Sequence, residues 1–261
     1  MAESPLGILS ALPEEMTHLG DVLEPAGDVA IAGFRFRPGR IDGHAVVLAE
    51  AGVGKVATAL VGSLLLDRFG CRAMIFSGVA GRLDDELAIG DIVIADELIQ
   101  HDYGAMVGGR LTPYHPGVPP IGESLQSPGF RLDPRLRQAI ADAIADLRLP
   151  DFEGVGGSAR ASRISFGRIL SGDQFVNCAA MRDRLVRDFN GQAVEMEGGA
   201  LAQVCERFGT GCVVVRCLSD LAGEDSHIDF AAFLLGAANA AAIVVRRLVP
   251  VLAAQARSIP R

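Results

Sequence analysis

Ala45-Val-Val-Leu-Ala-Glu50, followed directly by Ala51-Gly-Val-Gly-Lys55, is the stretch that decides the fold class of this chain. Its first half is apolar and rich in Val, as expected for a buried strand, and its second half is a glycine turn. A helical pattern of apolar residues then continues through Leu66, and another apolar run at residues 73–77 predicts the next strand. Strand, turn, helix and strand in this order are typical of α/β proteins with a parallel or mixed sheet.

The alternation of strands and helices continues on both sides of this unit. Residues 7–12 predict a strand, and Glu14-Glu15 then opens an acidic first helical turn that suits the positive end of the helix dipole. Further along we expect strands at 91–99, 164–170, 194–197 and 212–218, a helix that begins at Asp133-Pro134, and a C-terminal helix from about Asp229. Residues 101–130 hold both Tyr residues and several Pro and Gly, so a long irregular segment is expected there, and a glycine-rich stretch lies at 154–157.

The composition indicates one domain. The 261 residues are 49% hydrophobic but only 5% aromatic, which suits a sheet covered by Ala-rich helices. No linker or internal repeat divides them, so we expect a single domain over residues 1–261 with a three-layer α/β/α architecture.

Charge and cysteine content limit the partners and the compartment. With a net charge of −8, the chain lacks the basic stripe that phosphate contacts require, so no nucleic-acid partner is expected. The sequence opens without the basic and apolar stretches of a signal peptide. The apolar C-terminal run is interrupted by Arg246 and Arg247 and is expected to be too short to span a bilayer. The five Cys residues form no CxxC pair and are typical of reduced core residues, so we expect a cytoplasmic protein with no membrane partner.

Two segments place charges where a buried strand ends. Glu195 and Glu197 flank Met196, and because side chains alternate along a strand, both carboxylates are expected on one side and Met196 on the other. Arg216 and Asp220 likewise share one side of a second apolar run. Buried charges are costly unless paired, so these residues are either salt bridges or catalytic groups, and the pattern alone favours neither. In open α/β sheets the ligand crevice lies beyond the carboxyl ends of strands, where both segments end.

Five segments, in order and with matching spacing, resemble the bacterial methylthioadenosine/S-adenosylhomocysteine nucleosidases of the nucleoside phosphorylase superfamily. They are Gly7-Ile-Leu-Ser-Ala-Leu-Pro-Glu-Glu-Met16, Ala51-Gly-Val-Gly-Lys-Val-Ala57, Ser171-Gly-Asp-Gln-Phe-Val176, Val194-Glu-Met-Glu197 and Arg216-Cys-Leu-Ser-Asp220, with Ser226-His-Ile-Asp-Phe230 further on. The likeness covers nearly the whole chain except residues 101–165. It implies a mixed, partly closed sheet wrapped by helices, a homodimer, and hydrolysis of a 5′-modified adenosine to adenine and the ribose product.

The resemblance also implies a role for each matching residue. Asp220, with Ser219 beside it, would protonate the leaving adenine, because a protonated base leaves more readily. Glu197 would bind the ribose hydroxyls, where a carboxylate favours the oxocarbenium-like transition state. Glu15, assisted by Arg216, would position and deprotonate the attacking water. Further residues are expected to contact the base, the ribose or the 5′-substituent: Val53, Phe175, Val176, Met196 and Phe230.

The same residues also have structural interpretations. Glu15 is equally suited to helix capping, and Asp220 to the N-cap of a helix after its strand. Phe175, Met196 and Phe230 are each as typical of a core as of a binding site. The five His residues show no metal-ligand spacing, and no dinucleotide fingerprint is present, so no metal and no organic cofactor are expected.

Two departures from the family leave the substrate and the reaction partly open. Val79 stands where the family has a Ser that helps to hold the water, and residues 101–116 differ from the loop that in the family closes the 5′-pocket of a dimer partner. A hydrolase of another 5′-modified nucleoside, such as aminodeoxyfutalosine, is therefore an alternative. A phosphorylase is another; Pro13-Glu-Glu15 would repel phosphate, whereas Arg82 would attract it. A nucleoside-binding protein without catalysis is the third, and the joint presence of Glu15, Glu197 and Asp220 argues against it.

Overall fold

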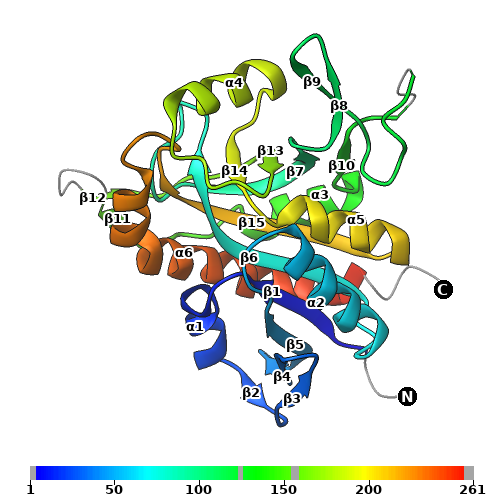
Figure 1. The fold of residues 1–261 in the computed structure, drawn as a ribbon. Helices are drawn as coiled ribbons and strands as arrows, with labels where there is room; N and C mark the ends of the chain where they lie inside the picture. The colour runs from blue at the N-terminus through cyan, green and yellow to red at the C-terminus, as the bar shows by residue number, and fades with distance from the viewer. Residues whose placement is uncertain (1–3, 123–125, 154–158, 256–261) are drawn as a thin grey trace.

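A mixed sheet of 11 strands forms the centre of the molecule, and helices cover it on both faces (Figure 1). The structure, a computed structural model, describes residues 4–122, 126–153 and 159–255. The strands of this sheet are β1 (Leu6–Ser10), β2 (Glu24–Pro25), β3 (Val29–Ile31), β4 (Phe34–Ile41), β5 (His44–Glu50), β6 (Ala73–Arg82), β7 (Ile92–Gln100), β10 (Gly129–Arg131), β13 (Ile164–Ser171), β14 (Ala193–Glu195) and β15 (Gly211–Asp220). Two hairpins stand apart from it: β8 (Gly104–Val107) with β9 (Arg110–Pro113), and β11 (Asp151–Glu153) with β12 (Ala159–Ala161).

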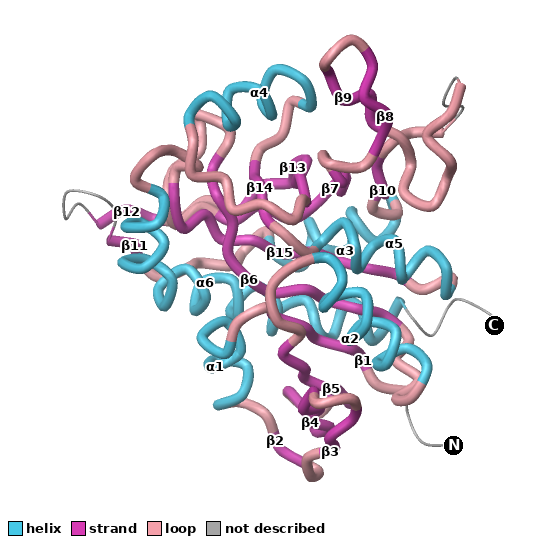
Figure 2. The backbone as a smooth tube through the Cα atoms, viewed as in Figure 1, coloured by secondary structure: helices cyan, strands magenta, loops and turns pink. Residues whose placement is uncertain are grey.

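Apart from α4, the helices fall into two layers, which confirms the expected three-layer α/β architecture. The helices are α1 (Pro13–Asp21), α2 (Lys55–Asp67), α3 (Pro134–Ile144), α4 (Ala179–Phe189), α5 (Gly198–Phe208) and α6 (Ser226–Gln255). On one face α6 packs against β6 and β15, with α1 and α3 beside it, and on the other α2 and α5 pack together (Figure 2). Local signals explain several helix starts; for example, Asp133 caps α3 by accepting hydrogen bonds from the amides of Arg135 and Leu136.

The sheet closes on itself in its central part, as the family resemblance implies. Successive pairing of β6, β14, β13, β7 and β15 returns to β6, so these strands form a ring. The length of β6 makes this closure possible. Its first half pairs with β1, and its last residues, Gly81 and Arg82, pair with β14, while β15 follows its other edge. Because β1, β5, β6 and β15 are parallel neighbours, their carboxyl ends meet at one edge of the sheet.

Some expected elements differ in extent. The strand expected at 73–77 continues through the glycine segment to Arg82, because β15 pairs with it as far as Gly81. The strand expected at 194–197 ends at Glu195, and Glu197 is already the N-cap of α5. The segment 101–130 is not wholly irregular, since it contains the β8–β9 hairpin and β10, which pairs with β7. The glycine-rich stretch at 154–157 lies outside the described residues.

The expectation that the C-terminal apolar run is too short to span a bilayer is wrong. Helix α6 has 30 residues and by length and composition alone would be able to cross a membrane. In the fold, however, side chains such as Val244, Val245 and Leu248 are fully buried in the core with residues of β6 and β15. Arg246, on the exposed side, forms an ion pair with Asp42 at 2.6 Å. These contacts bury one side of α6 against the sheet.

Candidate active site

A cavity of about 370 Å³ lies where the strand ends β1, β6, β14 and β15 meet the loops after β5 and β13 and the start of α6. Its walls combine acidic and apolar groups. The lining residues are Ala11, Leu12, Glu15, Val53, Val79, Ala80, Gly81, Phe175, Val194, Glu195, Met196, Glu197, Ser219, Asp220 and Phe230. Its place at the carboxyl ends of parallel strands is where α/β sheets usually bind ligands.

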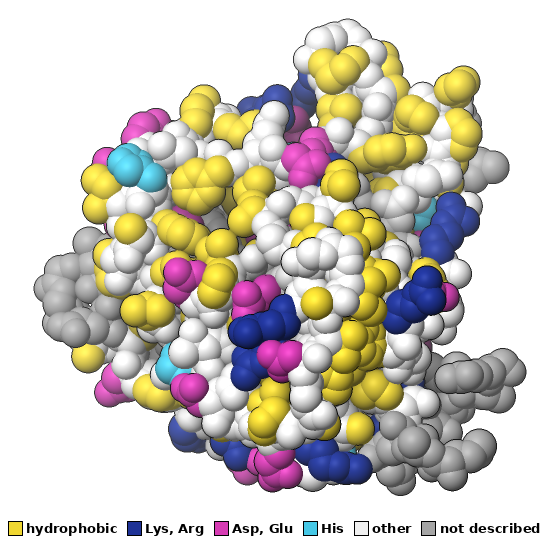
Figure 3. Space-filling model, turned by 60° about the horizontal axis from the view of Figure 1, so that its bottom comes forward, with side chains coloured by type: hydrophobic (Ala, Val, Ile, Leu, Met, Phe, Trp, Pro, Cys, Tyr) yellow, Lys and Arg dark blue, Asp and Glu magenta, His cyan; other side chains and the backbone are white. Residues whose placement is uncertain are grey.

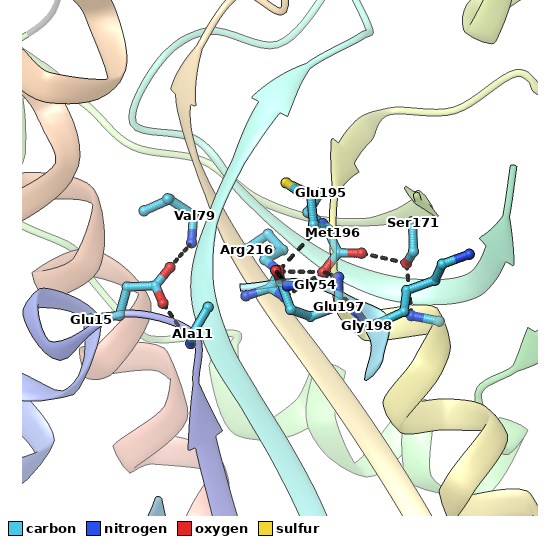
Figure 4. Close-up of polar contacts among 12 residues, drawn as sticks. Ala11, Glu15, Gly54, Val79, Ser171, Glu195, Met196, Glu197, Gly198 and Arg216 are labelled. Atoms are coloured by element: carbon cyan, nitrogen blue, oxygen red, sulfur yellow. Dashed lines mark hydrogen bonds and ion pairs between the residues drawn. The ribbon is translucent and has the colours of Figure 1, made fainter. Parts of the chain in front are cut away.

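Glu15 lies in the first turn of α1 and is buried. Its carboxylate accepts hydrogen bonds from the amides of Ala11 (2.8 Å), Leu12 (2.9 Å) and, across the cavity edge, Val79 (2.9 Å) (Figure 4). Burial raises the pKa of Glu15 above its ordinary value, although the charge of Arg216 and the three amides oppose this shift. The capping interpretation is therefore correct, but the same carboxyl group also lines the cavity, where a raised pKa suits a general base.

Arg216 is fully buried on β15 and lies between two carboxylates (Figure 4). Its guanidinium donates to Glu195, with Nε at 3.1 Å, and Nη2 lies 3.4 Å from Glu197. The group also stacks over the ring of Phe76, 4.3 Å from its centroid. Glu195 accepts further hydrogen bonds from the Ser171 hydroxyl and the Gly198 amide. Arg216 therefore lies behind the wall of the cavity, since it is not among the lining residues.

Two donors bind the carboxyl group of Glu197 at the cavity wall. The amide of Gly54 donates to its Oε1 at 2.9 Å, and Arg216 approaches its Oε2. Burial, together with the charge of Glu195, nevertheless raises the pKa of Glu197 to about 7. A proton on this carboxyl group is thus exchanged close to neutral pH.

Asp220 ends β15 and is 2% exposed. It is oriented by the Ser219 hydroxyl (3.0 Å) and the amide of Ala222 (2.9 Å), so it does not cap α6, which begins at Ser226. Burial raises the pKa of Asp220 above its usual range, although these hydrogen bonds oppose the shift. A carboxyl group that tends to keep its proton at an apolar cavity is suited to general acid catalysis.

Apolar side chains form the rest of the cavity. Phe175 and Phe230 meet edge to face, with ring centroids 6.0 Å apart, and both line the cavity with Met196 and Val53. Phe175 is 48% exposed and Val53 is 51% exposed, which places them at the open side rather than in the core. A flat aromatic ring of a ligand would find a stacking surface there.

The structure brings together most of the residues that the sequence analysis singled out. Those that line the cavity are Glu15, Val53, Phe175, Met196, Glu197, Ser219, Asp220 and Phe230. Val176 does not line it, because its side chain is buried in the hydrophobic cluster beneath α4. The alternation expected for Glu195, Met196 and Glu197 is wrong: all three line the cavity, because the strand ends before Met196.

Sequence reasoning left Glu195 open as a salt bridge or a catalytic group, and it missed Ser171. Glu195 lines the cavity and is the main partner of Arg216, and Ser171 donates to it from the end of β13. The Glu-x-Glu spacing was the available signal, but only the fold shows which carboxylate meets the arginine. Among the described residues, no group of three or more His, Cys, Asp or Glu side chains is arranged to hold a metal ion.

Comparison with known proteins identifies the family. The family model described as the phosphorylase superfamily matches residues 5–250. A 5′-methylthioadenosine/S-adenosylhomocysteine nucleosidase of Mycobacterium bovis is 46% identical over 250 residues, which covers 95% of this chain and 98% of the relative. The solved structure of such a nucleosidase from Colwellia psychrerythraea 34H, in complex with adenine, has a TM-score of 0.80 at 30% identity and is covered, like this chain, to 96%. The futalosine hydrolase of Helicobacter pylori strain 26695 has a TM-score of 0.79 at 28% identity, with coverage of 95% of this chain and 98% of that chain. This chain therefore belongs to the phosphorylase superfamily and, within it, to the family of 5′-methylthioadenosine/S-adenosylhomocysteine nucleosidases.

Proposed function

We propose that this protein hydrolyses the N-glycosidic bond of methylthioadenosine or S-adenosylhomocysteine and releases adenine. The observation that carries the proposal is the cavity itself, in which three buried carboxyl groups, Glu15, Glu197 and Asp220, surround an apolar surface. The identity of 46% to a relative with this name supports the choice of substrate.

The acid of the reaction is Asp220. Its raised pKa keeps a proton available, and Ser219 and the Ala222 amide fix the direction of the carboxyl group. Transfer of this proton to N7 of adenine makes the base a neutral leaving group. Phe175, at the open side of the same cavity, stacks on the adenine. The side chain of Val176 is buried away from the cavity, so only its backbone groups are left to pair with the edge of the base.

The other two carboxyl groups, Glu197 and Glu15, act on the sugar and the water. Glu197, in its ionised form, binds the ribose hydroxyls and stabilises the positive charge that develops on the ring. Glu15 takes the proton of the attacking water. Nη1 of Arg216 has no hydrogen-bond partner among the described residues, and a Cβ at Gly78 would lie 2.1 Å from it and 2.5 Å from Oε1 of Glu15, so the guanidinium lies beside the carboxyl group that takes this proton and assists it from behind the cavity wall.

Water is favoured over phosphate as the nucleophile by the charge of the cavity. No Lys or Arg side chain is among its described lining residues, whereas four carboxylates are: Glu15, Glu195, Glu197 and Asp220. Arg82, the residue that kept phosphorolysis open, is held by Asp85 at 2.8 Å and by the carbonyl oxygen of Leu87. A phosphate anion would thus meet a lining of carboxylates that offers no Lys or Arg side chain to bind it.

One panel experiment tests both the reaction and the substrate. The protein is incubated with methylthioadenosine, S-adenosylhomocysteine and aminodeoxyfutalosine, with and without phosphate, and free base and sugar product are measured. We expect adenine release from the first two at a rate independent of phosphate. A sugar phosphate product would show a phosphorylase, cleavage of aminodeoxyfutalosine alone would show the other hydrolase, and binding without cleavage of any would show a binding protein.

The working unit is proposed to be a homodimer. Helix α2 is apolar on both sides: Val61 and Leu65 are buried, whereas Val56 is 81% and Leu60 is 45% exposed. The β8–β9 hairpin also exposes Met106. Hydrophobic side chains gather in patches on the surface (Figure 3). Exposed apolar surface of this kind is typical of subunit interfaces.

The dimer is tested by light scattering of a Val56→Glu/Leu60→Glu variant. We expect the wild type to have twice the subunit mass and the variant to be monomeric and less active. Val29→Glu, at an exposed position on β3, is the matched control and should remain dimeric. A fully active monomeric wild type would contradict the proposal.

The proposed compartment is the cytoplasm. All five cysteines are free in the structure, including the buried Cys71, Cys205 and Cys217. Unpaired thiols of this kind are typical of a reducing compartment.

A further inference from the structure

Three charged side chains outside the cavity join two segments that line it, at Val53 and at Phe175, to the loop after β7. Lys55 opens α2 after the glycine turn, Asp102 follows β7, and Asp173 lies in the loop between β13 and α4. None of them lines the cavity. We propose that Lys55, Asp102 and Asp173 form a positioning clamp that holds the Gly54 amide against Glu197 and the loop of Phe175 at the cavity.

The contacts within this clamp are continuous. Nζ of Lys55 donates to Asp102 Oδ1 at 2.6 Å, and the other oxygen of Asp102 accepts the amide hydrogen of Asp173 at 3.0 Å. Asp173 in turn accepts from the backbone amide of Lys55 at 2.8 Å, and its second oxygen lies 3.9 Å from Nζ. Each of the three segments is thus bound to the other two.

The clamp acts at the N-terminus of α2, where amides are free to donate. Asp173 occupies the Lys55 amide, which leaves the preceding amide, that of Gly54, to Glu197 at 2.9 Å (Figure 4). Gly54 has φ of 99°, a conformation that side chains rarely adopt, and a Cβ there would lie 3.2 Å from Asp173. At this turn the Lys55 amide therefore binds the Asp173 carboxylate outside the cavity, and the Gly54 amide binds the Glu197 carboxylate at the cavity wall.

The ion pair at the centre of the clamp is partly shielded from water. The side chain of Lys55 is 17% exposed and that of Asp102 is 26% exposed. Burial alone would raise the pKa of Asp102, but the hydrogen bonds from Lys55 and the Asp173 amide bring it below its usual range. Asp102 is therefore ionised across the neutral pH range, in which Glu197 titrates.

This inference rests on the proposed function, because Glu197 matters there as the ionised ligand of the ribose. The groups that face Glu197 are Glu195 and Glu15, which raise its pKa, and Arg216 and the Gly54 amide, which lower it. If the amide is released, the pKa of Glu197 rises, and the ionised form is lost at a higher pH. The clamp therefore affects the acidic side of the pH profile, which a purely structural ion pair would not do.

Kinetics of the full-length protein with methylthioadenosine test the clamp. In Lys55→Met we expect kcat/KM to fall roughly three- to tenfold, the size of one lost hydrogen bond. The acidic limb of the pH profile of kcat/KM should move to higher pH. Asp102→Asn should lower kcat/KM in the same way. The double variant should have the same kcat/KM as Lys55→Met, because each single substitution removes the same ion pair between Lys55 and Asp102. Lys55→Arg, which keeps the charge, should restore the wild-type profile.

Asp42→Asn is the matched control, since it breaks an ion pair of the same 2.6 Å length, with Arg246, at positions that do not line the cavity. It should leave the pH profile unchanged. If Lys55→Met and Asp102→Asn give the profile of this control, the clamp is not a positioning device. If the wild type cleaves no nucleoside at all, the proposed function fails instead, so the two failures are distinguishable.

Discussion

At the scale of single residues, the site depends on carboxyl groups that burial makes reluctant to ionise. Glu15, Glu197 and Asp220 all have raised pKa values, and burial is the largest cause in each case. The three carboxyl groups differ in their hydrogen-bond partners, and this difference suits them to the different roles proposed above. Glu15 is held by backbone amides, Glu197 by an amide and an arginine, and Asp220 by a hydroxyl and an amide.

Asp220→Asn tests the proton donor. The amide keeps the shape of the side chain but has no proton to transfer, so kcat should fall by about 10²–10⁴-fold, the usual contribution of a general acid. Thermal melting serves as the folding control and should stay within a few degrees of the wild type. Near-normal turnover in a folded variant would show that another group protonates the base.

Glu15→Gln separates water activation from substrate binding. The glutamine cannot accept the water proton, so turnover should stop, whereas a nucleoside should still bind in a calorimetric titration. The structure adds a cost, because the carboxylate accepts amide hydrogen bonds on both of its oxygens and the glutamine NH₂ would face one of these donors. We expect a loss of about 1–3 kcal/mol in the free energy of unfolding. Unchanged stability, or retained turnover, would contradict this assignment.

At the scale of elements, the close pairing of β6 and β15 brings the acid cluster together. Gly78 lies opposite Arg216 in this pair, and its missing side chain leaves room for two charged groups. A Cβ at this position would lie 2.1 Å from Nη1 of Arg216 and 2.5 Å from Oε1 of Glu15. The glycine is therefore required by space rather than by backbone conformation.

Gly78→Ala should displace both Glu15 and Arg216. We expect the variant to lose about 1–3 kcal/mol of stability through overpacking and most of its kcat/KM. Gly211→Ala is the control on the same pair of strands, because a Cβ there meets nothing within 4 Å. Equal melting temperatures and activities of the two variants would show that the cluster tolerates a shift of the backbone.

At the scale of the whole molecule, the buried acids couple stability to pH. Glu197 has a pKa of about 7 in the fold against an ordinary value of 4.5. Between these two pH values the native state therefore holds a proton that the unfolded chain has released. The resulting stabilisation is complete below the lower value and disappears as the pH rises to the higher one. Glu15 and Asp220 act in the same direction, whereas Asp102 and Glu97, whose pKa values are lowered, act in the opposite one.

Glu197→Gln isolates this contribution, because its side chain does not titrate. The melting temperature of the wild type, minus that of Glu197→Gln, should decrease as the pH is raised from about 4.5 to about 7 and stay constant above. Differential scanning calorimetry over this range measures it. A difference that is constant throughout would show that Glu197 titrates as it does in the unfolded chain.

Features that depend on near neighbours in the chain are predictable from the amino-acid sequence. The strand–turn–helix unit that leads to α2, the start of α3 at Asp133-Pro134, and the acids at the strand ends all follow from periodicity, capping and turn chemistry. The family resemblance carried by five short motifs is confirmed by the comparisons, as is the mixed, partly closed sheet.

Contacts between residues that lie far apart in the sequence are visible only in the folded structure. The continuation of β6 to Arg82 depends on its pairing with β15, and Met196 lines the cavity because the sheet ends before it. Arg216 donates to Glu195. Lys55 binds Asp102, 47 positions further along the chain, and Asp173, 118 positions further along. The physical reason is that burial, pairing and charge contacts are set by neighbours in space, and the local patterns that mark a strand or a helix do not contain those neighbours.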